Sequence, residues 1–308
     1  MRLSLAASLG SLLALPPRPA VLRHGRVVCT DASWQLVTSR SNARLKLVKK
    51  LQTRRQREKS DLLLLEGHRL VMDAVDVAGL EPEFFVVHDD ALTTPAGIKL
   101  AAVLRRFSPE KVVRAPADLI AELSDTESPQ GVLAVVPQQP RPLPPNPSLV
   151  LVCDAVSDPG NMGTLLRSAA GAGVGACLLA PGCCDPWGLK ALRAGMGAQF
   201  RMPVHSVASW ADASAQLGRW GCGVLAADAG GVESHFEVNW NEASALVVGS
   251  EAHGLSEEVR NDPNVRLCRI PLGQAELPSN ADGVESLNAA VAGSVILFEA
   301  QRQRLQAK

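Results

Sequence analysis

Short apolar runs alternate with helical stretches along most of the chain, and this alternation constrains the fold more than any other feature of the sequence. Strands that alternate with helices pack as layered α/β domains built on largely parallel sheets. The alternation occupies two stretches, residues 61–136 and residues 149–304. A chain of 308 residues has room for two domains at roughly 150 residues each. We therefore expect an α/β protein with a small first domain and a parallel-sheet second domain.

The expected elements follow from apolar periodicity and from Gly, Pro and capping residues. Strands are expected at residues 61–66, 83–87, 111–114, 131–136, 149–153, 176–179, 202–207, 223–227, 245–249 and 267–271. Helices are expected at residues 68–77, 98–107, 117–123, 161–172, 186–199, 210–217, 256–260 and 286–304. Ligands of such sheets bind at the carboxyl ends of the strands.

A proline-rich segment, PQQPRPLPPNPS at residues 137–148, separates the two stretches. Proline cannot donate a backbone hydrogen bond, so this segment should form a stiff extended linker. It divides the chain into a first domain at residues 38–136 and a second at residues 149–308.

Charge is distributed unevenly although the net charge is zero. Residues 1–60 hold 13 Lys and Arg against two acids, Asp31 and Glu58. Residues 1–37 are rich in Arg and Ser and poor in acids, which is typical of an organelle transit peptide, chloroplast or mitochondrial. A secretory signal and an untargeted disordered tail are the alternatives, although no clean cleavage site follows the apolar run at residues 3–15.

The basic segment SRSNARLKLVKKLQTRRQREKS begins at Ser39. Leu45, Val48 and Leu51 recur at helical spacing and leave the rest of the helix to Lys and Arg. A solvated surface is the simpler interpretation, but so dense a charge favours contact with nucleic-acid phosphates. The expected RNA contacts are Arg40, Arg44, Lys46, Lys49, Lys50, Arg54, Arg55 and Arg57.

Composition excludes several other classes. Hydrophobic content of 46% with 20% charged residues is that of a folded globular protein. The longest apolar run is shorter than the roughly 20 residues that span a bilayer, so no membrane association is expected. Seven cysteines without a CxxC pair fit neither a disulfide framework nor a zinc site, so we expect reduced thiols and no metal.

A glycine motif, Gly171-Ala-Gly-Val-Gly-Ala176, matches the pattern of dinucleotide-binding proteins. That pattern requires a strand before it and a helix opening within it. Here a helix precedes and a strand follows, so Gly171 and Gly173 are better interpreted as a helix end and turn. A nicotinamide-dependent reductase is therefore disfavoured.

Three polar segments follow expected strands of the second domain. The first places Asn161 as the N-cap of a helix that carries Arg167. The second presents Glu251 after Gly249, a residue that permits close approach of a ligand to the backbone. The third has Ser286 as N-cap of the last helix and Asn288 in its first turn. Each segment alone could serve capping and turn formation, but all three converge on one edge of the sheet.

These segments, DPGNMGTLLRSA, LVVGSEAHGL and IPL…ESLNAAVAGSVILFE, resemble in order the three signature motifs of the SpoU (TrmH-like) family of RNA ribose 2'-O-methyltransferases. The intervening LKALRAGMGAQFRMPV is similar to that family's middle segment. SRSNARLKLVKKL…LLLLEGHRLVMDAV and SPQGVLAVV resemble its small substrate-binding domain. The resemblance covers about residues 38–304.

The resemblance implies a carboxyl-terminal domain tied in a deep trefoil knot, S-adenosylmethionine as cofactor, and a homodimer whose active site draws on both subunits. The residues that match the family's functional positions are Asn161, Arg167, Glu251, Ser286 and Asn288. The cofactor would rest on Leu225, Ala226, Ala227, Gly249, Ile270, Leu272 and Leu287. The implied substrate is RNA, ribosomal RNA by family association. The composition of the amino-terminal segment places it in an organelle.

The chain departs from the family pattern in two places. Residues 273–283 add about eight residues to a loop expected beside the cofactor, and Gly195 stands where the family more often has Ser. The insertion leaves open a non-catalytic RNA-binding or ribosome-assembly protein that retains the fold. Transfer RNA as the methylated substrate also remains open.

Overall fold

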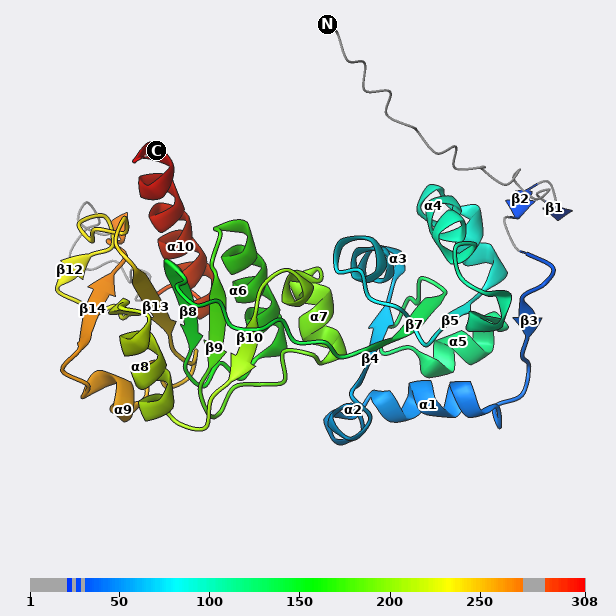
Figure 1. Ribbon diagram of the computed structural model, residues 1–308, viewed down its shortest axis with the longest axis horizontal. Helices are drawn as coiled ribbons and strands as arrows, with labels where there is room; N and C mark the ends of the chain where they lie inside the picture. Colours follow the sequence, from blue (N-terminus) through cyan, green and yellow to red (C-terminus); the bar gives the residue numbers. More distant parts are fainter. Residues whose placement is uncertain (1–20, 24–25, 29–30, 274–285, 308) are drawn as a thin grey trace, which may run out of the picture.

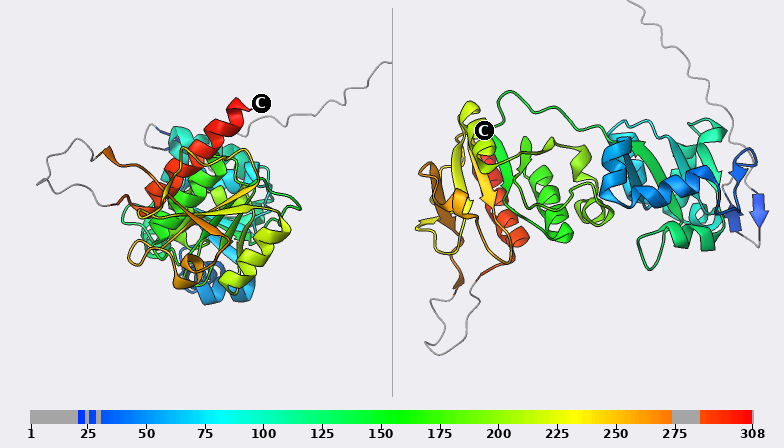
Figure 2. Two further views of the ribbon diagram at one scale, coloured as in Figure 1. Left: turned by 90° about the vertical axis from the view of Figure 1, so that its left-hand side faces the viewer. Right: turned by 90° about the horizontal axis from the view of Figure 1, so that it is seen from below.

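The computed structural model describes residues 21–23, 26–28, 31–273 and 286–307. It has two sheet-based domains joined end to end, with α7 (Leu189–Gly195) at the junction (Figure 1). The segment 138–148 contains no helix or strand and passes along one side of the molecule between the domains (Figure 2). A hairpin of β1 (Val21–Arg23) and β2 (Arg26–Val28) precedes them.

The first domain has a five-stranded sheet in the order β3-β6-β5-β7-β4. β3, β6 and β5 are parallel to one another, and β7 is antiparallel to both β5 and β4. The strands are β3 (Gln35–Leu36), β4 (Leu62–Glu66), β5 (Phe84–Val87), β6 (Val112–Arg114) and β7 (Val132–Pro137).

Helices cover both faces of this sheet because successive strand residues point to opposite sides. In β5, Phe85 and Val87 pack with α3 and α4, whereas Phe84 and Val86 pack with α1 and α5. The helices are α1 (Ala43–Leu51), α2 (Arg54–Ser60), α3 (His68–Met72, continued by a π-helical turn at Asp73–Val77), α4 (Pro95–Leu104) and α5 (Ala117–Leu123). Short 3₁₀ turns lie at Asp89–Thr93 and Pro109–Lys111.

The folded domain begins earlier than residue 38. Trp34 and Val37 are buried, at 3% and 6% exposure, and β3 pairs with β6. Trp34 and Val37 therefore belong to the core of the first domain, and the exposed residues between them form an edge strand of its sheet. Residues 1–20, 24–25 and 29–30 of the expected transit peptide lie outside the described part of the chain.

The second domain has a seven-stranded sheet in the order β10-β9-β8-β13-β11-β14-β12, and every ladder in it is parallel. This confirms the predicted α/β fold with a parallel-sheet carboxyl domain. The strands are β8 (Leu149–Cys153), β9 (Ala176–Leu179), β10 (Val204–Ser206), β11 (Gly223–Ala227), β12 (Glu233–Ser234), β13 (Ser244–Val248) and β14 (Val265–Arg269).

Helices sandwich the second sheet. Leu149, Leu151 and Cys153 of β8 pack under α6 (Pro159–Gly171) and α10 (Ala289–Gln306), while Val150 and Val152 pack under α8 (Trp210–Arg219) and α9 (Glu257–Arg260). A 3₁₀ turn at Ala198–Phe200 follows α7. β13 lies between β8 and β11, so chain order reverses there, and this is where parallel sheets open a ligand crevice.

The two domains are held in a fixed contact by the segment around α7. Trp187, Leu192 and Phe200 enter the core of the first domain, and Leu189 packs on the opposite face of the same sheet. Arg193 pairs with Asp125 at 3.0 Å across this contact.

Candidate functional site

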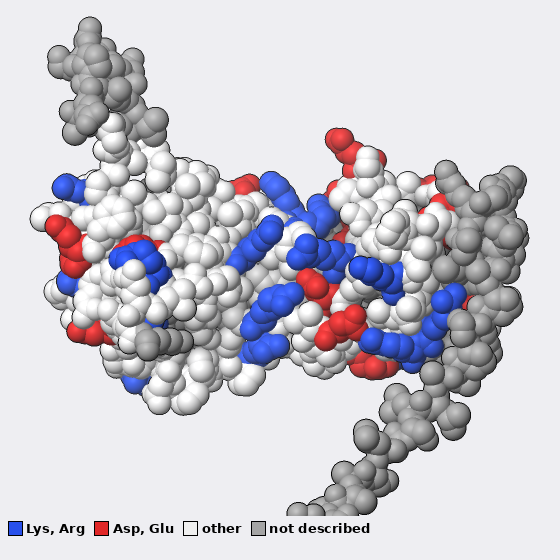
Figure 3. All heavy atoms as spheres, turned by 90° about the horizontal axis from the view of Figure 1, so that it is seen from above, with Lys and Arg blue, Asp and Glu red and all other residues white. Residues whose placement is uncertain are grey.

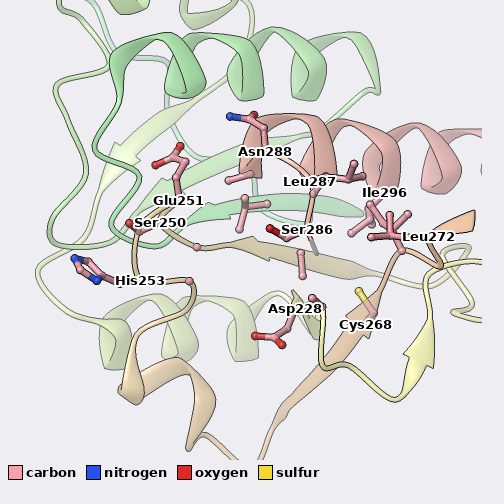
Figure 4. A pocket seen from close by; sticks show the side chains of 18 of the residues that line it. Asp228, Ser250, Glu251, His253, Cys268, Leu272, Ser286, Leu287, Asn288 and Ile296 are labelled. Carbon is pink, nitrogen blue, oxygen red and sulfur yellow. The ribbon is translucent and has the colours of Figure 1, made fainter. Parts of the chain in front are cut away.

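A cavity of about 520 Å³ opens at the carboxyl ends of β13, β11 and β14 (Figure 4). Its volume lies in the range of about 300–1,000 Å³ that small-molecule sites occupy. Its walls combine apolar side chains with a few polar groups: Ala227, Asp228, Ala229, Val248, Gly249, Ser250, Glu251, His253, Gly254, Arg260, Cys268, Ile270, Leu272, Ser286, Leu287, Asn288, Ala289, Ala292 and Ile296.

The turn after β13 forms one wall of the cavity. Ser250 and Gly254 exchange two backbone hydrogen bonds of 2.9 Å, so the chain doubles back immediately after the strand. A Cβ at Gly249 would lie 2.5 Å from the carbonyl carbon and oxygen of Gly254. The close approach of this turn to the strand therefore requires glycine at position 249. The sequence suggested only that this glycine lets a ligand approach the backbone.

Asn161, Glu251 and Asn288 meet at the edge of this cavity. The Nδ2 of Asn161 donates to Oε1 of Glu251, and the Nδ2 of Asn288 donates to Oδ1 of Asn161 at 3.2 Å. Glu251 and Asn288 also line the cavity. The structure therefore brings together three residues from the three separate sequence segments.

Asp158 fixes the position of Asn161 at the start of α6. The predicted cap was wrong, because Asp158 is the N-cap of α6 and its Oδ1 accepts from the backbone N–H of Asn161 at 2.9 Å. Lys190 of α7 pairs with Oδ2 of Asp158 at 3.2 Å. The backbone hydrogen bond from Asn161, helped by Lys190, lowers the pKa of the Asp158 carboxyl.

A second predicted cap is also corrected at α10. Asn288 is the N-cap, with Oδ1 accepting from Ala290 N–H at 3.0 Å and Val291 N–H at 3.2 Å. Ser286 lies two residues before it and lines the cavity instead. Since the Asn288 amide donates to Asn161, one side chain both begins the last helix and fixes the polar cluster.

Arg167 lies apart from this cluster within the single chain. It is exposed on α6 and is not among the residues that line the cavity. Its neighbour Ser168 contacts Ser294 of α10 at 2.7 Å, so Arg167 lies beside the surface where α6 and α10 pack.

Five of the seven expected cofactor residues line the cavity, namely Ala227, Gly249, Ile270, Leu272 and Leu287. The other two, Leu225 and Ala226, are buried within the sheet at 1% and 0% exposure and do not reach it. Most of the insertion at residues 273–283 lies outside the described residues.

Most of the expected RNA contacts are exposed or half-buried on α1, α2 and the segment before them. Arg40 pairs with Glu122, Arg44 stacks 5.5 Å from the Phe84 ring centroid, and Arg54 pairs with Glu58 at 2.7 Å. Lys46, Lys49, Lys50 and Arg55 face solvent. Further Lys and Arg side chains gather over the waist between the domains (Figure 3).

Arg57 corrects the expectation made for it. Its side chain is 6% exposed, and its guanidinium donates to the Leu51 and Gln52 carbonyls and pairs with Asp185 of the second domain. A buried group of this kind cannot contact an RNA phosphate. It joins the two domains.

Asp228 and Arg260 are cavity residues that the sequence analysis missed. Asp228 directly follows β11, so the rule that ligands bind at strand ends pointed to it. No local signal marked Arg260 at the end of α9.

The Cys183 thiol is not poised for chemistry. Cys183 donates to the Cys153 carbonyl at 3.2 Å, and burial raises the pKa of the Cys183 thiol well above its ordinary value. Within the described residues, no group of three or more His, Cys, Asp or Glu is arranged to hold a metal ion. No helix in the same residues is long and apolar enough to cross a membrane.

Comparison with known proteins gives concordant matches. Residues 148–298 match the SpoU rRNA Methylase family, and residues 42–134 match the MRM3-like substrate binding domain. The human rRNA methyltransferase 3, mitochondrial, is 33% identical over 301 residues, covering 80% of this chain and 69% of that protein. The Bacillus subtilis (strain 168) 23S rRNA (guanosine(2553)-2'-O)-methyltransferase RlmP is 31% identical over 265 residues, covering 85% of this chain and 97% of that one.

Solved structures agree with these matches. A crystal structure of an RNA 2'-O ribose methyltransferase has a TM-score of 0.74 at 28% identity and covers 88% of this chain and 100% of its own. An AdoMet-bound rRNA methyltransferase from Sinorhizobium meliloti has a TM-score of 0.70 at 27% identity and covers 88% of this chain and 98% of its own.

Proposed function

The chain belongs to the SpoU rRNA methylase family, as its motifs predicted, and we propose that it methylates the ribose 2'-hydroxyl of ribosomal RNA with S-adenosylmethionine. The expected enzyme class, an RNA ribose methyltransferase, is confirmed by its relatives. The observation that carries the proposal is the cluster of Asn161, Glu251 and Asn288 at the edge of the cavity.

The cavity residues fit S-adenosylmethionine. A volume of about 520 Å³ is sufficient for a nucleoside-sized ligand, and Ile270, Leu272, Leu287 and Ile296 supply apolar walls for an adenine ring. When bound, this cofactor supplies an electrophilic sulfonium methyl group. The AdoMet-bound rRNA methyltransferase from Sinorhizobium meliloti, a structural neighbour of this chain, supports this assignment.

The polar cluster would orient the ribose for attack. Positioning of reacting atoms can supply several kcal/mol of barrier reduction when their geometry is fixed beforehand. Asn161 is fixed by the Asp158 cap and by the amide of Asn288, and it in turn fixes Oε1 of Glu251. Among the described residues no contact engages Oε2 of Glu251, which leaves it to accept a hydrogen bond from the 2'-hydroxyl.

Arg167 would act through its positive charge. An arginine side chain does not release its proton near neutral pH, so it is a poor general base. Its planar guanidinium suits a phosphate or a developing alkoxide. Because Arg167 lies outside the cavity of its own chain, we assign it to the cavity of a partner subunit in a homodimer.

The surface of α10 supports the homodimer. Val291, Val295, Phe298 and Leu305 are 46%, 39%, 48% and 63% exposed and follow one another along the same side of the helix. An apolar stripe of this kind is typical of an interface. It runs beside α6, so pairing of two copies here would bring each Arg167 toward the other subunit. The trefoil knot belongs to the same family-based proposal.

We place the protein in the mitochondrion, since its relatives include mitochondrial rRNA methyltransferases. The basic segment of the first domain would hold the RNA, and the residues before the folded domain would act as the transit peptide. A chloroplast location has no comparable support among these relatives.

Isothermal titration of the purified protein with S-adenosylmethionine tests the proposal against a non-catalytic assembly protein. We expect saturable binding at one site per chain, abolished by a bulky Gly249→Val substitution. An absence of binding would contradict the methyltransferase and favour the non-catalytic alternative. Methylation of transfer RNA but not ribosomal RNA would support the proposed methyltransferase chemistry and contradict the proposed substrate.

A further inference from the structure

Arg260 connects two walls of the cavity that come from different parts of the chain. Its Nη2 pairs with Oδ2 of Asp228 at 2.7 Å, in the turn that follows β11. Its Nε donates to the carbonyl of Leu255 at 3.3 Å, in the turn that follows β13. Both Asp228 and Arg260 line the cavity.

Asp228 is itself fixed from several sides. Its backbone N–H donates to the Cys268 carbonyl at 3.0 Å, and its Oδ1 accepts from Gly230 N–H at 2.8 Å. Its side chain is 14% exposed, whereas that of Arg260 is 42% exposed. In Figure 4, Asp228 lies apart from Asn288 and Glu251, across the cavity from the polar cluster.

We propose that Asp228 and Arg260 are positioning residues for the cofactor. Their ion pair holds the two turns at the spacing that S-adenosylmethionine requires, and Asp228 neutralises the charge of Arg260 beside the cofactor. This inference rests on the function proposed above. It does not assign the pair a part in methyl transfer, because both residues lie away from the cluster of Asn161, Glu251 and Asn288.

The fixed spacing of the two turns should favour binding of the cofactor. A ligand that enters between two loops binds more tightly when the loops already stand at the correct distance, because less conformational freedom is lost on binding. Arg260 ties the turn after β13 to the turn after β11 without the ligand. Loss of the pair should therefore weaken binding of any adenosyl ligand.

The charged groups of the cavity should distinguish two related ligands. Of the groups that line the cavity, Asp228 and Glu251 are acidic, Arg260 is cationic, and His253 is titratable. Without Asp228, the charge of Arg260 would be unpaired in a cavity that receives a sulfonium cation. S-adenosylhomocysteine lacks that positive charge, so it should suffer less from the same substitution.

The experiment measures Kd by isothermal titration for Arg260→Gln, Asp228→Asn and the unsubstituted protein, with both ligands. We expect Arg260→Gln to raise Kd about 5-fold for both ligands, the factor that a partly exposed ion pair provides. We expect Asp228→Asn to raise Kd for S-adenosylmethionine about 3-fold more than for S-adenosylhomocysteine. Arg260→Lys, which keeps the charge, should recover part of the loss.

Arg266→Gln is the matched control, because it breaks an ion pair with Glu233 at 3.3 Å whose members do not line the cavity. Thermal unfolding of each ligand-free variant shows whether a change in Kd reflects damage to the fold. Binding within 2-fold of the unsubstituted protein for both variants, or an equal loss in Arg266→Gln, would overturn the inference. Absence of binding by the unsubstituted protein would instead overturn the proposed function, and the inference with it.

Discussion

The side-chain amide of Asn161 donates a hydrogen bond to the carboxylate of Glu251, ninety residues further along the chain. Asn161 lies in the first turn of α6 and Glu251 lies in the turn after β13, so the contact joins the carboxyl ends of two neighbouring strands. Asn288 completes it from the start of α10. Three signature segments thereby become one polar cluster.

Removal of the Asn161 amide should therefore damage catalysis more than binding. We expect Asn161→Ala to lower kcat by about 10²-fold, the effect of a small misplacement of reacting groups, with little change in Kd for S-adenosylmethionine. Single-turnover methyl transfer and titration measure the two quantities. Asn241→Ala, in an exposed surface turn, should leave both unchanged. Equal losses in kcat and binding would mean that Asn161 only supports the cavity.

The N-cap of α6 should make stability depend on pH. The pKa of Asp158 is lowered in the folded protein, so its stabilisation is complete above the unfolded-state pKa and is lost as pH falls through the folded-state pKa. We expect Asp158→Ala to cost about 1 kcal/mol at pH 7 and less near pH 3 in urea unfolding. Thr94→Ala removes a cap that does not titrate, and its cost should not vary in this way. A pH-independent cost for Asp158→Ala would contradict the assignment.

Substitutions of Arg57 and Arg55 should affect different properties, namely protein stability for Arg57 and RNA binding for Arg55. Arg57 is buried against Asp185, so Arg57→Ala should lower the free energy of unfolding by about 3 kcal/mol, the cost of leaving a buried partner unpaired. Arg55 is exposed on the same helix, and Arg55→Ala should leave stability within about 0.5 kcal/mol while weakening RNA binding. Urea unfolding and filter binding at fixed salt measure the two effects. The reverse pattern would restore Arg57 to the RNA contacts.

The apolar stripe on α10 should control the oligomeric state. Phe298 is 48% exposed, and we expect Phe298→Glu to convert a dimer into a monomer in sedimentation equilibrium, with loss of methyl transfer because Arg167 then reaches no partner cavity. Ile98→Glu places the same charge at a 46% exposed position on α4 and should leave the dimer intact. A monomeric unsubstituted protein with full activity would refute the shared active site.

Periodicity was sufficient to predict most elements. The segments expected at residues 117–123, 149–153, 176–179 and 223–227 coincide with α5, β8, β9 and β11. Short buried runs between turn residues leave few other arrangements. Gly171 ends α6 and Gly173 has a φ of +76°, as their place between a helix and a strand predicted.

The errors have local and long-range causes. Asp158 and Asn161 are both residue types that commonly cap helices. Pro159 follows Asp158 directly, and because proline is favoured at the first helical position, it identifies Asp158 as the N-cap. The burial of Arg57 was not predictable, because its partner Asp185 lies 128 residues away in the other domain. The same holds for Arg260, whose ion pair with Asp228 arises only when the turn after β11 meets the segment after β13.

The most direct test of the account is transfer of a labelled methyl group from S-adenosylmethionine to large-subunit ribosomal RNA by the purified protein, with the product mapped to nucleotide and atom. We predict a ribose 2'-O-methyl group at one principal site, and a loss of about 10²-fold in rate for Glu251→Gln. Methylation of a base, or an unchanged rate in Glu251→Gln, would contradict the account.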